Sequence, residues 1–146
     1  MGIAYRIDQE RGIIYVVYDR LVTDDDFVAH TNRLMVDPAW PPRLRLHLTD
    51  ISTQTDPHRM TKSVIRRMAE MWGTQAEQMR GMRIAVVANE AFDNALAFEQ
   101  SISRYGPNLI VFNLLPTACA WLGIDVDVAE QTLQAIRAEM REASRP

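Results

Sequence analysis

Three histidines are the residues of this sequence best suited to move a proton or to bind a metal ion. His30 lies in an expected helix, His47 in an expected strand and His58 at the start of the next helix. No two of them have the spacing of a His-x-x-x-His metal motif. A set of Ser52, His58 and Asp50 lacks the Gly-x-Ser-x-Gly turn that exposes a nucleophile. We therefore interpret the histidines as structural or surface residues, and we predict no catalytic residue, no metal ligand and no cofactor.

Polar side chains follow three of the expected strands, at the point where each strand ends. In parallel sheets, ligands bind beyond the carboxyl ends of the strands. Asn89 also stands at a helix start, where backbone N–H groups can receive an anion. The alternative is that these side chains only cap helices and hydrogen-bond their own loops. If the chain has a ligand or partner site, we expect it to contain Asp50, Ser52, Thr53, Asn89 and Asn113.

Short apolar runs predict five strands. The run at 83–89 follows Gly81 and precedes a helical pattern, which is typical of a strand buried on both faces. Residues 3–7 and 12–18 are rich in aromatic and β-branched residues and are joined by a short polar connection, which predicts an antiparallel hairpin. In residues 44–50, leucines alternate with Arg45, His47 and Thr49, which predicts one apolar and one polar face. The last strand is expected at 109–113.

The expected helices alternate with these strands. Thr23 precedes three aspartates and an apolar repeat, which predicts a capped helix over 24–36. The three carboxylates splay about 100° apart on a helix, so they favour capping over a cation site. Asp56 and Pro57 indicate the start of the next helix. Further helices are expected at 91–105 and 116–123, and a last one from Asp127, with Glu130 as its capping-box partner.

This order predicts an α/β fold with a mixed five-stranded sheet, in which the antiparallel hairpin is followed by three parallel strands, and with four to five helices. Residues 1–146 form a single domain, and a C-terminal helix at 125–143 is appended to its core. Arg6, Arg45, His47 and Arg83 occupy polar positions of apolar strands. We therefore expect part of one sheet face to be thinly covered, or covered by a second subunit.

Composition limits the partners and the compartment. The formal net charge is −3, which argues against nucleic acid as a partner. Charged residues near the N-terminus interrupt any signal peptide, and no apolar run reaches membrane-spanning length, so we expect a cytoplasmic protein. Cys119 is the only cysteine, which excludes an intrachain disulfide and a thiolate metal cage.

Several core-forming segments resemble those of a known family. The hairpin, the Leu-Thr-Asp-Ile segment that ends at Ile51, the strand Arg-Ile-Ala-Val-Val-Ala, and Leu-Ile-Val-Phe-Asn-Leu-Leu-Pro-Thr-Ala-Cys-Ala-Trp-Leu-Gly are similar to segments of small bacterial STAS-like proteins. These proteins are relatives of the sporulation anti-sigma-factor antagonist and are grouped by fold with CRAL-TRIO-type lipid-binding domains. The resemblance covers about residues 3–124.

The resemblance implies a regulatory role only in part. In regulatory members, a serine in an Asp-Ser-Ser-Gly motif is phosphorylated by a partner kinase, whereas the matching region here runs from Asp50 to Thr61 without that motif. We expect a non-catalytic protein-interaction or regulatory module that self-associates as a homodimer and has a regulatory protein partner. The alternative is a carrier that binds a small apolar or lipid-like ligand between the sheet and the helices.

Overall fold

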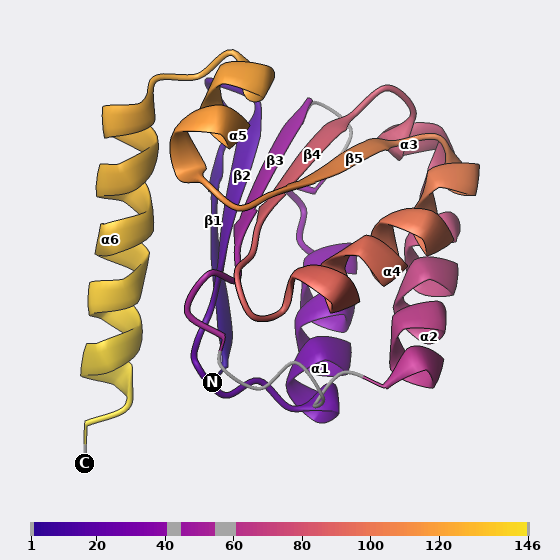
Figure 1. The fold of residues 1–146 in the computed structure, drawn as a ribbon, viewed down its shortest axis with the longest axis horizontal. Coiled ribbons are helices and arrows are strands. Elements are labelled where there is room, and N and C mark those ends of the chain that lie inside the picture. The colour runs from indigo at the N-terminus through magenta and orange to yellow at the C-terminus, as the bar shows by residue number, and fades with distance from the viewer. Residues whose placement is uncertain (1, 41–44, 55–60, 146) are drawn as a thin grey trace.

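The computed structural model describes residues 2–40, 45–54 and 61–145 (Figure 1). Within these residues, five strands form one sheet whose spatial order follows the sequence. They are β1 (Ile3–Asp8), β2 (Ile13–Tyr18), β3 (Leu46–Asp50), β4 (Arg83–Val87) and β5 (Asn108–Phe112). β1 and β2 are antiparallel, and β2 to β5 run parallel to one another. The predicted α/β fold with a mixed five-stranded sheet is confirmed.

The helices cover both faces of the sheet (Figure 1). Helices α1 (Asp24–Met35), α2 (Lys62–Gly73) and α4 (Phe92–Ile102) are the connections between successive parallel strands. Each connection moves to the next strand in the same direction, and right-handed crossovers of this kind place their helices on one face. Helices α5 (Leu115–Leu122) and α6 (Val126–Ala143) cover the opposite face. Two short elements, α3 (Ala76–Met79) and the 3₁₀ helix η2 (Ser103–Tyr105), follow α2 and α4.

The alternation of side chains along the strands builds two cores. In β2, Ile14, Val16 and Tyr18 point into the core beneath α1, α2 and α4, whereas the residues between them point toward α5 and α6. All six residues of β2 are buried. This is the pattern of a strand covered by helices on both sides.

Local capping sets the helix starts, and it corrects one prediction. Thr23 caps α1 through the backbone N–H of Asp26, and Asp26 accepts from the backbone N–H of Thr23, so the predicted capped start is confirmed. The capping box predicted from Asp127 is wrong, because Asp125 is the N-cap of α6 and accepts from two backbone N–H groups of the first turn. The predicted start of the second helix at Asp56 and Pro57 lies outside the described residues, and α2 begins after Thr61.

The polar strand positions do not form one thinly covered face. Arg6 and Arg83 lie on the α5/α6 side, where Arg6 pairs with Glu139 and Arg83 donates to the carbonyl of Trp121. His47 points to the opposite side and is buried. His47 and Thr49 share one face of β3, as the alternation predicted, but this face is buried and not thinly covered, because a central strand of this sheet has helices over both of its faces.

The C-terminal helix belongs to the same fold unit as the sheet. Ala129, Leu133 and Ile136 of α6 are buried in the core that it shares with α5 and the strands. The helix thus packs on its own sheet. No helix in the described part of the chain has the length and hydrophobicity needed to cross a bilayer.

Candidate functional site

The five residues predicted at the strand ends lie together. They line one surface depression of about 440 Å³, bounded by the ends of β3, β4 and β5 and by α6. Helix α6 also lines this depression, through Glu130, Gln134 and Arg137, and this contribution was not predicted from the sequence. Only the packing of α6 against its own sheet brings these side chains to the strand ends. The residues that line the depression are Asp50, Ser52, Thr53, Val87, Asn89, Asn113, Leu114, Leu115, Glu130, Leu133, Gln134 and Arg137.

Most of these polar groups are already hydrogen-bonded within the protein. Asp50 is buried, accepts from the backbone N–H of Ser52 at 2.8 Å, and forms an ion pair with Arg137. Asn89 donates to the carbonyl of Ser52 at 3.3 Å, and Thr53 donates to a carbonyl of β2 at 3.4 Å. These bonds hold the loop that follows β3 against its neighbours. They give Asp50, Thr53 and Asn89 a structural function at this edge of the sheet.

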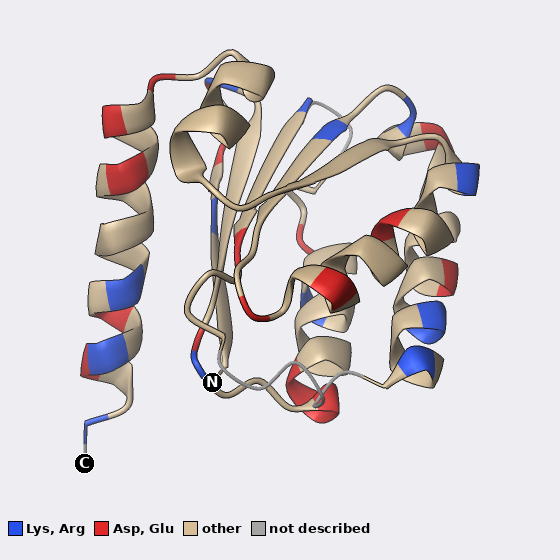
Figure 2. Ribbon diagram, in the orientation of Figure 1, with Lys and Arg blue, Asp and Glu red and all other residues tan. Residues whose placement is uncertain are grey.

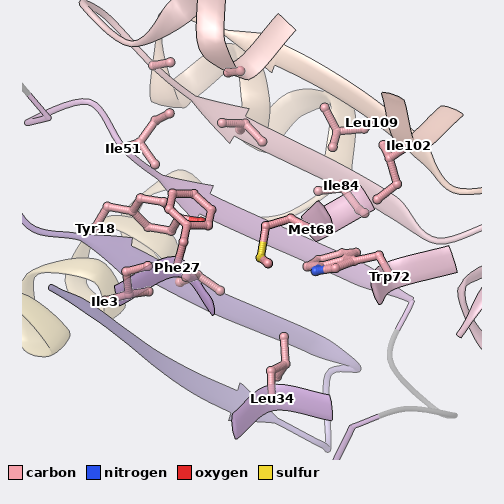
Figure 3. Packing of buried hydrophobic residues seen from close by; sticks show 14 of the residues in the cluster. Ile3, Tyr18, Phe27, Leu34, Ile51, Met68, Trp72, Ile84, Ile102 and Leu109 are labelled. Carbon is pink, nitrogen blue, oxygen red and sulfur yellow. The ribbon is translucent and has the colours of Figure 1, made fainter. Parts of the chain in front are cut away.

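A second hollow lies inside the larger core, between the sheet and helices α1, α2 and α4. It is a cavity of about 50 Å³ with mostly apolar walls. Figure 3 shows Met68 of α2 between Trp72 on one side and Phe27 with Tyr18 on the other, and all four line the cavity. Four further polar side chains line it: His30, Thr31, His47 and Thr49. We call this hollow the histidine cavity.

The two histidines are held by aromatic rings. His47 stacks on Trp72, with ring centroids 5.4 Å apart and an interplanar angle of 28°, and it meets the edge of Trp40 at 6.0 Å. His30 packs edge-on against Tyr5 and Tyr18, at 5.7 and 6.4 Å. Trp40 is thus buried in the core. The rings fix both imidazoles in position without using their nitrogens.

Neither histidine has a hydrogen-bond partner for Nδ1 among the described residues, and both Nδ1 atoms are buried. The exposed fractions of His30 and His47 are 4% and 2%. Buried polar atoms in native proteins are almost always paired, and an unpaired one costs about 1–3 kcal/mol. His30 and His47 thus line the same cavity, and the buried Nδ1 of each is unpaired.

Burial also sets the charge of the two histidines. It lowers the pKa of His30 to about 4, with a smaller contribution from the cation of Arg33. Burial lowers the pKa of His47 to about 3, with a smaller contribution from His30. Both imidazoles are neutral at neutral pH, so each has one nitrogen that donates and one that accepts. The cavity thus offers hydrogen bonds without offering charge.

The charged groups around the histidine cavity are few. Among the described residues, no carboxylate lines it, so none of them orients either imidazole as a proton carrier. Within residues 2–40, 45–54 and 61–145, no three His, Cys, Asp or Glu side chains gather as metal ligands. Cys119 is buried, and burial raises the pKa of its thiol, which agrees with a structural residue.

No family model matches this chain, and no curated protein or solved structure matches it either. The resemblance to STAS-like proteins therefore stays a prediction from the sequence, and the function has to be argued from the site.

Proposed function

We propose that this protein is a non-catalytic binding module whose ligand occupies the histidine cavity. The observation that carries this proposal is the pair of unpartnered, buried Nδ1 atoms of His30 and His47 beside one apolar cavity. Apolar walls with a few placed polar groups are typical of small-molecule sites. The proposal follows the carrier alternative that the sequence left open, with the ligand between the sheet and the helices.

The cavity size limits the ligand. An engineered apolar cavity of about 150 Å³ accepts benzene, and the histidine cavity has about 50 Å³. A compact molecule of a few heavy atoms, or the tip of a larger one, fits this space. An acyl chain would need α2 or α4 to move away from the sheet. The ligand of this conformation is thus a small, uncharged, mostly apolar molecule with a hydrogen-bonding group.

The polar walls define the recognition chemistry. A neutral imidazole can donate to a carbonyl or ether oxygen, or accept from a hydroxyl, depending on its tautomer. Tyr18, Phe27 and Trp72 contact the apolar part. An alcohol or a ketone satisfies both requirements, whereas a carboxylate would bring an unpaired charge into an apolar cavity at high cost.

Methyl NMR of the methionines tests this proposal. Butan-1-ol is the probe, since it combines a short apolar chain with one hydroxyl, and xenon is the purely apolar probe. We expect butan-1-ol to shift the methyl signal of Met68 saturably, with a Kd of about 1 mM, as suits a ligand of five heavy atoms. Met79 and Met82 are equally buried but do not line the cavity, so their signals are the internal control.

A variant separates the polar contacts from the space. In His30→Leu/His47→Leu, xenon should still shift Met68, while the affinity for butan-1-ol should fall about thirtyfold, since the two lost hydrogen bonds contribute about 1 kcal/mol each. The proposal is wrong if neither probe shifts Met68 in the unmodified protein. It is also wrong if the variant binds butan-1-ol as tightly as the unmodified protein does.

The regulatory role, the self-association and the cytoplasmic location expected from the sequence belong to the same proposal. A module that binds a small molecule without converting it acts by transporting that molecule or by reporting its presence to a partner. The apolar surface that such a partner would contact includes Leu114 beside β5, which is 59% exposed.

A further inference from the structure

A third hollow lies between the C-terminal half of α6 and the segment that follows β2. Its volume is about 260 Å³, and it is separate from the histidine cavity. Three arginines from two distant parts of the chain line it: Arg20, Arg137 and Arg141. Figure 2 shows the basic residues of α6 gathered in its C-terminal half. We call this hollow the arginine groove.

The groove has more positive than negative groups. Among the described residues, neither Arg20 nor Arg141 forms an ion pair, whereas Arg137 pairs with Asp50. Asp19 is the one carboxylate among the described residues that lines the groove, and it accepts from the backbone N–H of Arg20 at 2.8 Å. The whole chain carries a formal net charge of −3, so this local excess of guanidinium groups opposes the overall composition.

Arg137 supplies a second, independent observation. One terminal nitrogen of its guanidinium bonds to Asp50, but its Nε is buried and has no partner among the described residues. A buried donor on a charged group is costly when it is unpaired. An oxyanion in the groove would meet the guanidinium groups of Arg20 and Arg141, beside the partly paired guanidinium of Arg137.

The walls identify the class of ligand. The planar fork of a guanidinium matches the oxygens of a phosphate, and the two guanidinium groups of Arg20 and Arg141, which form no ion pair among the described residues, favour a dianion over a single carboxylate. Val17, Tyr18 and Met140 supply apolar contacts beside them. The volume lies just below the usual range of small-molecule pockets. We propose that the arginine groove binds the phosphate group of a small phosphorylated organic molecule.

Phenyl phosphate is a suitable probe, because it joins a phosphate to one small apolar ring. Titration into the full ¹⁵N-labelled chain at 150 mM salt should shift the backbone signals of Arg20, Arg141 and Ser144 saturably. Phenol, which lacks the phosphate, should leave these three signals unchanged. In Arg20→Gln/Arg141→Gln, the affinity for phenyl phosphate should fall at least tenfold. Both arginines are exposed, so the variant keeps the fold.

The control is Arg66→Gln/Arg67→Gln, which removes the same charge from the exposed face of α2. Its affinity for phenyl phosphate should equal that of the unmodified protein. The proposal fails if the shifts grow linearly without saturation, or if the control loses as much affinity as the groove variant. It also fails if the chain binds vesicles containing phosphatidic acid but not phenyl phosphate, because the phosphate would then come from a lipid surface.

We expect the binding of phenyl phosphate to be independent of whether the histidine cavity binds a ligand. The His30→Leu/His47→Leu variant should bind phenyl phosphate as the unmodified protein does. Tyr18 borders both hollows, so it is left unchanged in every variant.

Discussion

Mild acid should destabilise this protein through its two buried histidines. A histidine in the unfolded chain has a pKa of about 6.5, whereas burial holds the folded pKa of His30 at about 4 and that of His47 at about 3. Below pH 6.5 the unfolded chain therefore binds protons that the folded chain does not, and the free energy of unfolding falls with pH. The stabilisation is complete above pH 6.5 and decreases as the pH falls toward 4.

The magnitude follows from the slope of about 1.4 kcal/mol per pH unit for each histidine. Between pH 6.5 and pH 5, each contributes a loss of about 2 kcal/mol, or about 4 kcal/mol for the pair. Domains have total stabilities of about 5–15 kcal/mol, so this loss is large. Aspartates with an ordinary pKa near 3.9 in the unfolded state contribute little above pH 5, so this pH window isolates the histidines.

Urea unfolding followed by circular dichroism at pH 7 and pH 5 measures the loss. His47→Phe keeps an aromatic ring over Trp72 and should remove about half of the acid sensitivity, as should His30→Phe. His58 is present in all of these proteins, so its contribution cancels. An NMR titration of the imidazole protons in the unmodified protein provides a direct measurement. If either buried imidazole titrates above pH 5.5 in the folded state, or if His30→Phe/His47→Phe loses as much stability between pH 7 and pH 5 as the unmodified protein does, the reasoning is refuted.

Two further predictions concern stability at neutral pH. Arg137→Ala leaves the buried carboxylate of Asp50 without its ion-pair partner and should cost about 2–3 kcal/mol in urea unfolding, whereas Asp50→Asn/Arg137→Gln should recover part of that loss. Equal stabilities of the single and double variants would contradict this coupling. Gly123 ends α5 with φ of +74°, so Gly123→Ala should lower the free energy of unfolding by about 1 kcal/mol, although an added Cβ would meet no neighbour. An unchanged midpoint of thermal unfolding would show that this backbone conformation is not required.

The fold was predictable because its signals are local. Apolar runs of strand length alternate with helical repeats, and the handedness of parallel crossovers then fixes which helices share a face. The predicted capping of α1 by Thr23 is confirmed, because a threonine directly before three aspartates is a favourable N-cap for an acidic first turn. The start of α6 was misplaced because Asp125 and Asp127 are both plausible caps by sequence. The structure selects Asp125, which alone has extended backbone angles, with φ of −71° and ψ of 127°.

The candidate sites were predictable only in part. Parallel strands end at one edge, so Asp50, Asn89 and Asn113 had to lie near one another, and they do. The burial of His47 was missed because leucines on both sides of it gave an alternating pattern that is typical of a half-exposed strand. The place of β3 in the sheet decides the matter: it pairs with β2 and β4, and a central parallel strand has no solvent face. The central position of β3 is a property of the sheet topology, and a local sequence pattern does not reveal it.

Buried polar atoms without a hydrogen-bond partner are a better guide to the proposed site of this protein than a large number of polar side chains. The residues at the strand ends are more numerous and more conspicuous in the sequence, yet Asp50 and Asn89 are already bonded to their neighbours. His30 and His47 are fewer and more deeply buried, and their Nδ1 atoms have no partner within the described chain. Apolar residues of similar size would fill these two positions without an unpaired nitrogen, so the histidines lower stability where they stand. On the function proposed above, a ligand that accepts from or donates to them would turn this cost into affinity, because it would satisfy the groups that destabilise the empty protein.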